Sequence, residues 1–237
     1  MNILAVDTAG SMLTVAVRTD TYFEEANLRP QGMRHSETIM PAIFDICRSC
    51  NTEIADIDLF VCTRGPGSFT GLRIGMATVK GLAFGLEKPV VSVSTLEYHA
   101  KSISHFDGCV IPAIDARKDK YYLGVFECRE GECRRLMSDI DGTVDDLERY
   151  VDLYSSVLVA GPDREVFAGI LKDKYPLKNI TTECEYTVPK GVALIDLGLE
   201  RYGTLGADDI GQGPVYLRKS DAEIALEEKL AKEKDNV

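Results

Sequence analysis

Apolar runs alternate with amphipathic stretches along this chain, a pattern typical of an α/β fold. The first run, Ile3 to Val6, ends in Asp7, and after a short turn Leu13 to Val17 forms a second run, which predicts a hairpin. The same arrangement recurs where Ile111 to Asp115 is followed by Tyr121 to Phe126. Two strand–aspartate–turn–strand units indicate a duplicated βββαβα architecture.

A first helix is predicted between the two units, from Ser36 to Cys50. Ser36 is suited to cap its N-terminus, and Pro41 either bends the helix or marks its true start. The apolar positions form one stripe along this helix, which consists of Ile39, Met40, Ile43, Phe44 and Cys47. Such a stripe predicts a helix that packs on one side.

A second helix, from Leu72 to about Leu86, follows a strand at Asp58 to Cys62. One of its faces is nearly bare, because it carries Gly71, Gly75, Thr78, Gly81 and Gly85. Glycine in a helix costs about 1 kcal/mol relative to alanine, so this face requires a reason. Two readings stay open: close packing on the chain's own sheet, and a helix–helix contact between subunits.

The second half has shorter and less regular elements than the first. It predicts a strand near Val157 to Ala160 and helices near Val166 to Lys174 and Val192 to Tyr202. We therefore expect a two-lobed α/β protein, with a first lobe over residues 1–100 and a degenerate second lobe over residues 101–218. Residues 219–237 are expected to form a charged C-terminal helix that can pack back on the first lobe.

The charge balance argues against direct contact with nucleic acid or membrane. The 237 residues include 38 acidic and 27 basic side chains, a formal net charge of -11, which repels phosphate backbones and anionic lipid. The N-terminus lacks the basic start and the unbroken apolar stretch of a signal peptide. No run reaches the ~20 apolar residues of a membrane span. These features predict a cytoplasmic protein.

Seven irregularly spaced cysteines do not suggest a disulfide framework in a chain long enough to bury its own core. Cys47 and Cys50 form a C-x-x-C pair, but at the end of a helix the dipole raises rather than lowers a thiol pKa, which argues against a redox role. Cys128 and Cys133 are the only other close pair, so a zinc site is disfavoured and we predict no bound metal.

A glycine-rich stretch from Gly65 to Arg73 joins a strand to a helix N-terminus, where backbone N–H groups can bind an anion. It is not a Walker loop, because Leu72 and Arg73 follow Gly71 where that motif has lysine and a hydroxyl residue. The alternative to anion binding is a tight turn capped by Ser68 or Thr70.

The candidates for a nucleotide site are Asp7, Gly10, Ser11 and Asp115. Asp7 and Asp115 each end a strand. Acidic residues that hold a Mg-nucleotide between two lobes occupy the same kind of position. Gly10 and Ser11 suit the adjoining turn, but Ala116 to Asp119 offers neither glycine nor hydroxyl. The three histidines cannot be placed with a nucleophile. We thus expect an incomplete nucleotide site, no bound cofactor and no catalytic residue.

The stretch Gly65-Pro-Gly-Ser-Phe-Thr-Gly-Leu-Arg73 is similar to the signature of the TsaB (YeaZ) family, as is Lys80-Gly-Leu-Ala83. Further segments resemble family positions in the expected order, namely Ile3-Leu-Ala-Val-Asp-Thr8, His35-Ser-Glu37, Val93-Ser-Thr-Leu96, Asp115-Ala-Arg117 and Pro214-Val-Tyr-Leu-Arg218. The resemblance covers the chain nearly end to end.

The resemblance implies an actin/Hsp70/sugar-kinase-like (ASKHA) fold and a role in making threonylcarbamoyladenosine next to the anticodon of tRNA. It implies a non-catalytic dimerization subunit that pairs with a TsaD-like transferase, is joined by a TsaE-like ATPase, and forms homodimers through much the same surface. Contact with tRNA is expected only through the complex. The family's older label, glycoprotease-like, is no argument for peptidase activity.

TsaD-like proteins have an H-x-x-x-H pair, and the corresponding stretch here is Thr95 to His99, so one metal ligand is missing. The partner interface is expected on the two helices, at His35, Ser36, Ile39, Met40, Ile43, Cys47, Arg73, Gly75, Thr78 and Leu82. The alternative function is a small ATPase or phosphotransferase that uses Asp7, Gly10 and Asp115. A zinc peptidase would need a metal site that the sequence does not supply.

Overall fold

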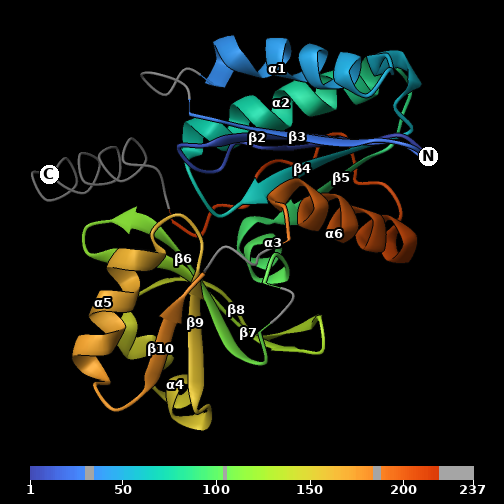
Figure 1. Cartoon of the computed structure of the whole chain (residues 1–237). Helices are drawn as coiled ribbons and strands as arrows, with labels where there is room; N and C mark the ends of the chain where they lie inside the picture. Colours follow the sequence, from blue (N-terminus) through green and yellow to red (C-terminus); the bar gives the residue numbers. More distant parts are fainter. Residues whose placement is uncertain (30–34, 104–105, 184–187, 219–237) are drawn as a thin grey trace, which may run out of the picture.

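The computed structural model describes residues 1–29, 35–103, 106–183 and 188–218, and it forms two lobes that each contain a five-stranded mixed sheet (Figure 1). In the first lobe the strand order is β3-β2-β1-β4-β5. Strands β1 to β3 pair antiparallel, whereas β4 and β5 continue the sheet in parallel with β1. The bounds are β1 Ile3–Asp7, β2 Leu13–Arg18, β3 Phe23–Leu28, β4 Leu59–Gly65 and β5 Val90–Ser94.

The second sheet repeats this topology, with the order β10-β9-β6-β7-β8. Its first three strands are again antiparallel, and β9 and β10 are added in parallel with β6. The bounds are β6 Gly108–Arg117, β7 Lys120–Arg129, β8 Glu132–Gly142, β9 Ser156–Ala160 and β10 Asn179–Thr182. The predicted duplicated α/β fold is therefore confirmed.

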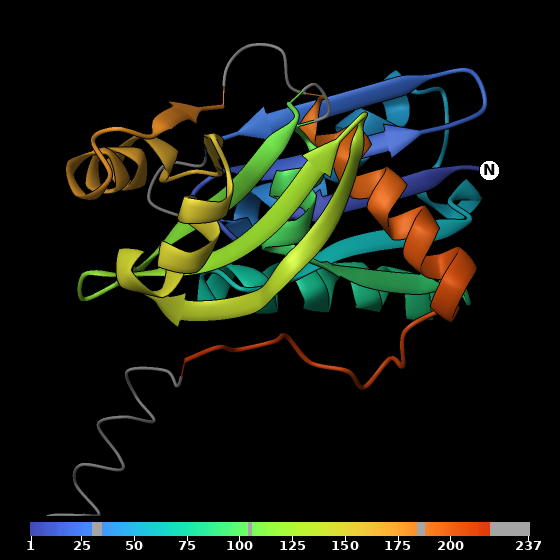
Figure 2. The same ribbon diagram turned by 90° about the horizontal axis from the view of Figure 1, so that it is seen from below.

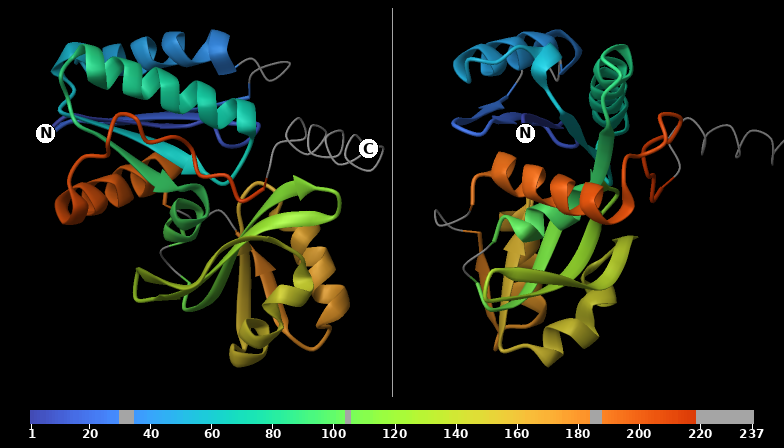
Figure 3. Two further views of the ribbon diagram at one scale, coloured as in Figure 1. Left: turned by 180° about the vertical axis from the view of Figure 1, so that it is seen from behind. Right: turned by 90° about the vertical axis from the view of Figure 1, so that its right-hand side faces the viewer.

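Helices cover both faces of the first sheet (Figures 1 and 3). Helices α1 (His35–Ser49) and α2 (Phe69–Gly85) lie on one face, and α3 (Thr95–Lys101) and α6 (Lys190–Leu205) lie on the other. Alternate residues of β1 point to opposite faces, so Leu4 belongs to the core under α1 and α2, whereas Ile3 packs against α6. Burial on both sides explains why β1 is apolar throughout.

Helix α6 corrects the predicted division of the chain at residue 100. It falls within the range expected for the second lobe, but its Leu194 and Ile195 pack on Ala5 and Val61 of the first sheet. The first lobe therefore requires a segment from late in the sequence. The predicted C-terminal helix, residues 219–237, lies outside the described residues.

Helices α4 and α5 of the second lobe are shorter than α1 and α2 of the first (Figure 2). Helix α4 (Glu148–Leu153) has six residues and α5 (Arg164–Lys174) has eleven, compared with fifteen in α1 and seventeen in α2. Short 3-10 helices are η2 (Ile54–Asp56) in the first lobe and η3 (Val144–Leu147) in the second. The second lobe nevertheless has its own apolar core, in which Phe167 is fully buried.

The two predicted helices of the first lobe are shifted slightly from their expected bounds. Helix α2 begins three residues earlier than predicted, at Phe69, because the hydroxyl of Ser68 accepts a hydrogen bond from the Gly71 N–H and caps it. Pro41 lies inside α1 on its exposed side, so it does not mark the start of the helix.

Residues 206–218 form a strap that returns from α6 along the first lobe (Figure 2). The Asp208 N–H donates to the Val90 carbonyl, and the Val215 N–H donates to the Arg64 carbonyl. The buried ammonium of Lys80 donates to the carbonyl oxygens of Asp209, Ile210 and Gln212. The strap is thereby attached to both β4 and α2.

The cysteines differ in part from the expectation. Cys128 and Cys133 are cross-strand neighbours on β7 and β8 and form a disulfide, although no disulfide framework was predicted. Hairpin register brings these two residues together, and their spacing alone does not reveal it. Cys47 and Cys50 are free and buried, and burial, followed by the neighbouring Cys50, raises the pKa of Cys47 to about 11. Such a thiol is poorly suited to redox exchange.

Candidate functional site

Asp7, the acidic residue at the end of β1, is buried, and its carboxylate is hydrogen-bonded to other residues of the chain. Its carboxylate accepts hydrogen bonds from the Thr63 hydroxyl and the Ala9 N–H, both at 2.8 Å, and from the Tyr98 hydroxyl. Burial, followed by the adjacent Asp7, raises the pKa of Tyr98 well above its ordinary value, so the phenol remains a donor. These three bonds use most of the roughly four acceptor positions of the carboxylate, which disfavours coordination of a nucleotide-bound metal.

The glycine-rich turn before α2 is filled by the backbone that follows β1. A β-carbon on Gly67 would lie 2.6 Å from the Ala9 carbonyl oxygen, and one on Gly71 would lie 2.1 Å from the Thr8 carbonyl oxygen. The Ser68 N–H also donates to the Ala9 carbonyl at 2.7 Å. The glycines therefore permit a close backbone contact within the chain, and the capped turn, rather than an anion site, explains their positions.

The other first-lobe candidates lie in the β1–β2 turn. Gly10 is half-buried, and its carbonyl oxygen lies 2.9 Å from Nε2 of the buried His35, which begins α1. Ser11 is exposed. His35 is thus an internal link between the turn and α1.

Asp115 occupies a different environment from Asp7. It is exposed, and its carboxylate accepts the Arg117 N–H at 2.7 Å within the β6–β7 turn. That turn has φ values of 68°, 58° and 58° at Arg117, Lys118 and Asp119, a left-handed conformation that is unfavourable for residues with a β-carbon. Asp115 is thus held within its own turn, whereas Asp7 is held within the core, and a nucleotide site that uses both residues stays a prediction.

The remnant of the H-x-x-x-H pair is buried on α3. Thr95 and His99 are both at most 5% exposed, and burial, followed by the charges of Lys190 and Arg164, lowers the pKa of His99 well below its ordinary value. Its ring stacks on Tyr98 with centroids 4.3 Å apart. Among the described residues, no group of three His, Cys, Asp or Glu side chains is arranged to hold a metal ion.

Several residues predicted for the partner interface lie inside the first lobe. His35, Ile39, Ile43, Cys47 and Gly75 are buried, because they form the sides of α1 and α2 that face the sheet. The apolar stripe of α1 was therefore correctly located, but most of it packs on the protein's own core. Of the predicted interface, Ser36, Met40, Arg73, Thr78 and Leu82 are wholly or partly accessible.

Two aromatic side chains outside the predicted interface are exposed on these helices, although Phe44 belongs to the predicted apolar stripe. Phe44 of α1 is 53% exposed and Phe84 of α2 is 72% exposed. The helices contact each other on the same face of the sheet, so their outer sides form one surface (Figure 3). The helical periodicity could have revealed Phe84, since it lies about 100° from the buried Ala83 and about 140° from the buried Val79 around the helix.

The fold and the matched sequence features place the chain in a defined class of tRNA-modification proteins. The profile of the TsaD family, described as tRNA N6-adenosine threonylcarbamoyltransferase, matches residues 30–176. The chain is also 33% identical to the tRNA threonylcarbamoyladenosine biosynthesis protein TsaB of Bacillus subtilis over 225 residues, 94% of this chain and 96% of that protein. The chain belongs to the TsaB family of tRNA threonylcarbamoyladenosine biosynthesis proteins.

Two further comparisons agree with this family. The TsaB protein of Escherichia coli is 39% identical over 130 residues, which cover 54% of this chain and 55% of that protein. The structure of YeaZ from Pseudomonas aeruginosa aligns with a TM-score of 0.75 and 26% identity, covering 91% of this chain and 99% of that one. None of the described helices is both long and apolar enough to span a membrane.

Proposed function

We propose that this chain is a non-catalytic subunit that binds a TsaD-like transferase and supports threonylcarbamoyladenosine formation next to the anticodon of tRNA. The observation that carries the proposal is the environment of Asp7. Its carboxylate is hydrogen-bonded within the core, and the Thr8–Ala9 backbone lies against the turn where a phosphate would otherwise bind. A chain that has filled this site with its own atoms is suited to a structural role.

The proposed contact with the transferase is the outer side of α1 and α2. It combines two exposed aromatic side chains, Phe44 and Phe84, with Met40 and Leu82, which are partly buried. Exposed aromatic residues contribute strongly when a partner covers them. The same surface would serve a homodimer, so the two assemblies would compete.

The remaining partners follow from charge and family. A net charge of -11 gives little attraction to tRNA, so tRNA binding would depend on the transferase, and a TsaE-like ATPase would join the pair. Such a complex would work in the cytoplasm. The alternative, an ATPase or phosphotransferase, would require a nucleotide to displace the hydrogen bonds of Asp7, and no described contact favours it.

The decisive experiment combines the chain with the TsaD-like protein of the same organism. We expect the two to co-purify, and tRNA threonylcarbamoylation to require both. The purified chain alone should show no nucleotide hydrolysis above that of an Asp7→Asn variant. Modification that proceeds equally well without the chain, or turnover that Asp7→Asn abolishes, would contradict the proposal.

A further inference from the structure

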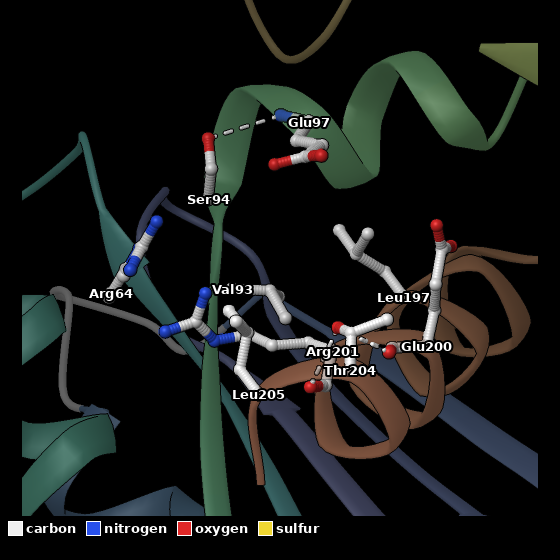
Figure 4. A pocket seen from close by; sticks show the side chains of 9 residues that line it. All are labelled: Arg64, Val93, Ser94, Glu97, Leu197, Glu200, Arg201, Thr204 and Leu205. Carbon is white, nitrogen blue, oxygen red and sulfur yellow. Dashed lines mark hydrogen bonds between the residues drawn. The ribbon is translucent and has the colours of Figure 1, made fainter. Parts of the chain in front are cut away.

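A cavity of about 180 Å³ opens where β4, β5 and α3 meet α6 (Figure 4). It lies on the face of the first sheet opposite α1 and α2, and is therefore separate from the proposed partner surface. Leu197 and Val93 supply apolar walls, whereas Arg64 and Arg201 supply two guanidinium groups, which Figure 4 shows on the same side of the pocket.

Arg64 is directed into the cavity by an irregularity in β4. The pairing of β4 with β5 passes from Thr63–Val93 to Gly65–Ser94, so Arg64 is the extra residue of a bulge, which turns a side chain out of the regular alternation. Its carbonyl is held by the Val215 N–H, which fixes the backbone at this point. The bulge and the strap therefore position the guanidinium from two sides.

The guanidinium of Arg64 is half-buried, and the carboxylates of Asp208, Glu97 and Asp139 act on it only from beyond ion-pair distance. In the described part of the chain it forms no side-chain hydrogen bond and no ion pair within 4.0 Å. Burial, followed by repulsion from Arg201, lowers the pKa of Arg64 below its ordinary value. A partly desolvated cation in this position is stabilised by any anion that enters the cavity.

The acidic side chains of the cavity already have cationic partners outside it. Glu97 binds Arg135 at 3.0 Å, and Glu200 binds Lys101. Arg201 is held by Asp208 at 3.2 Å through Nη2, but its buried Nε has no hydrogen-bond partner in the described structure. The two carboxylates that line the cavity are therefore each paired with a cation, whereas Arg64 forms no ion pair among the described residues.

We propose that this cavity is a binding site for a small oxyanion, a carboxylate or phosphate group, held between Arg64 and Arg201. The Arg64 fork can donate two parallel hydrogen bonds to either group. The Thr204 hydroxyl donates to main-chain carbonyls of α6 and can turn toward the ligand. A volume of about 180 Å³ suits a small anionic metabolite.

The test is calorimetric titration of the full-length chain with inorganic phosphate and, separately, with succinate, at constant ionic strength maintained by chloride. We expect saturable binding at one site for at least one of the two anions, and the tighter one identifies the preferred group. Arg64→Gln should weaken that binding at least tenfold. Arg48→Gln is the matched control, because Arg48 lies on α1 with its side chain 82% exposed, and it should bind as wild type does.

Thermal melting separates a ligand-binding arginine from a structural one. Because Arg64 has no internal partner, Arg64→Gln should melt within a few degrees of wild type when no anion is added, and Arg64→Lys should recover part of the binding. The proposal is overturned if neither anion binds, or if Arg64→Gln binds as tightly as wild type. It is equally overturned if Arg64→Gln melts far below wild type while Arg64→Lys restores melting without binding. No partner protein is needed, so the outcome is independent of the proposed function.

Discussion

A β-carbon added to Gly75 would lie 2.1 Å from the hydroxyl oxygen of Thr8, whose hydroxyl donates to the Gly71 carbonyl at 2.8 Å. Helix α2 thus rests directly on the residue that follows β1. The glycines on the bare face of this helix have two kinds of surroundings. Gly71 and Gly75 pack against the chain itself, whereas a β-carbon on Gly81 or Gly85 would meet open space. Gly75 therefore reports on folding and not on a partner contact.

Gly75→Ala should destabilise the protein, because even one methyl group cannot be placed without moving Thr8. Overpacking of this kind costs about 1–3 kcal/mol. Gly81→Ala is the control in the same helix: it is exposed and unobstructed, so it should raise the free energy of unfolding by about 0.5–1 kcal/mol through helix propensity. Urea denaturation of the two variants measures both signs. Equal effects would contradict the contact with Thr8.

Phe84→Asp should prevent association with the TsaD-like protein and reduce homodimer formation while leaving the melting temperature near that of wild type. The side chain is 72% exposed, so the isolated fold loses little, but a charge there must be desolvated in an interface. Phe44→Asp tests the neighbouring helix. Leu177→Asp, at a leucine that is 99% exposed on the second lobe, should leave association unchanged. Sedimentation velocity and co-purification give the result, and retained association in both phenylalanine variants would rule out this surface.

Stability should fall in acid partly because of His99. Its pKa in the folded protein is well below that of the unfolded chain, so only the unfolded state gains this proton below about pH 6.5. The contribution of neutral His99 is present above that pH and is lost as the pH falls. The His99→Gln variant lacks this titrating group. Between pH 6 and 4 its free energy of unfolding should therefore fall less steeply with decreasing pH than that of wild type, by up to about 1.4 kcal/mol per pH unit. Parallel stability curves for the two proteins would show that His99 does not titrate on unfolding.

Lys80→Met should loosen the strap at residues 206–218. The ammonium donates to three carbonyl groups, and bonds to a charged donor contribute about 1.5–3 kcal/mol. We expect a loss of at least about 2 kcal/mol and faster hydrogen exchange at the Asp208 and Val215 amides, which bond to Val90 and Arg64. Lys172→Met, on the exposed side of α5, should change neither quantity. Unaltered exchange in Lys80→Met would mean that the strap is held by other contacts.

The sequence by itself determined the family, the duplicated fold and most strands. Periodic burial fixes these features: apolar runs such as Ile3–Val6 can be satisfied only inside a sheet covered on both faces. The glycine signature near Gly65 likewise has few physical explanations, and its spacing already excluded a Walker loop. Local pattern also located helices α1 and α2 to within a few residues.

Tertiary structure decided what each side chain of those elements touches. The sequence placed Ile39, Ile43 and Gly75 on helices but could not tell the side that faces the sheet from the side that faces a partner, because both are apolar or small. It marked Asp7 as a possible nucleotide ligand, whereas Tyr98, distant in the chain by 91 positions, occupies that carboxylate. The pairing of Cys128 with Cys133, the return of α6 to the first lobe, and the meeting of Arg64 with Arg201 likewise depend on contacts between segments that no local pattern encodes.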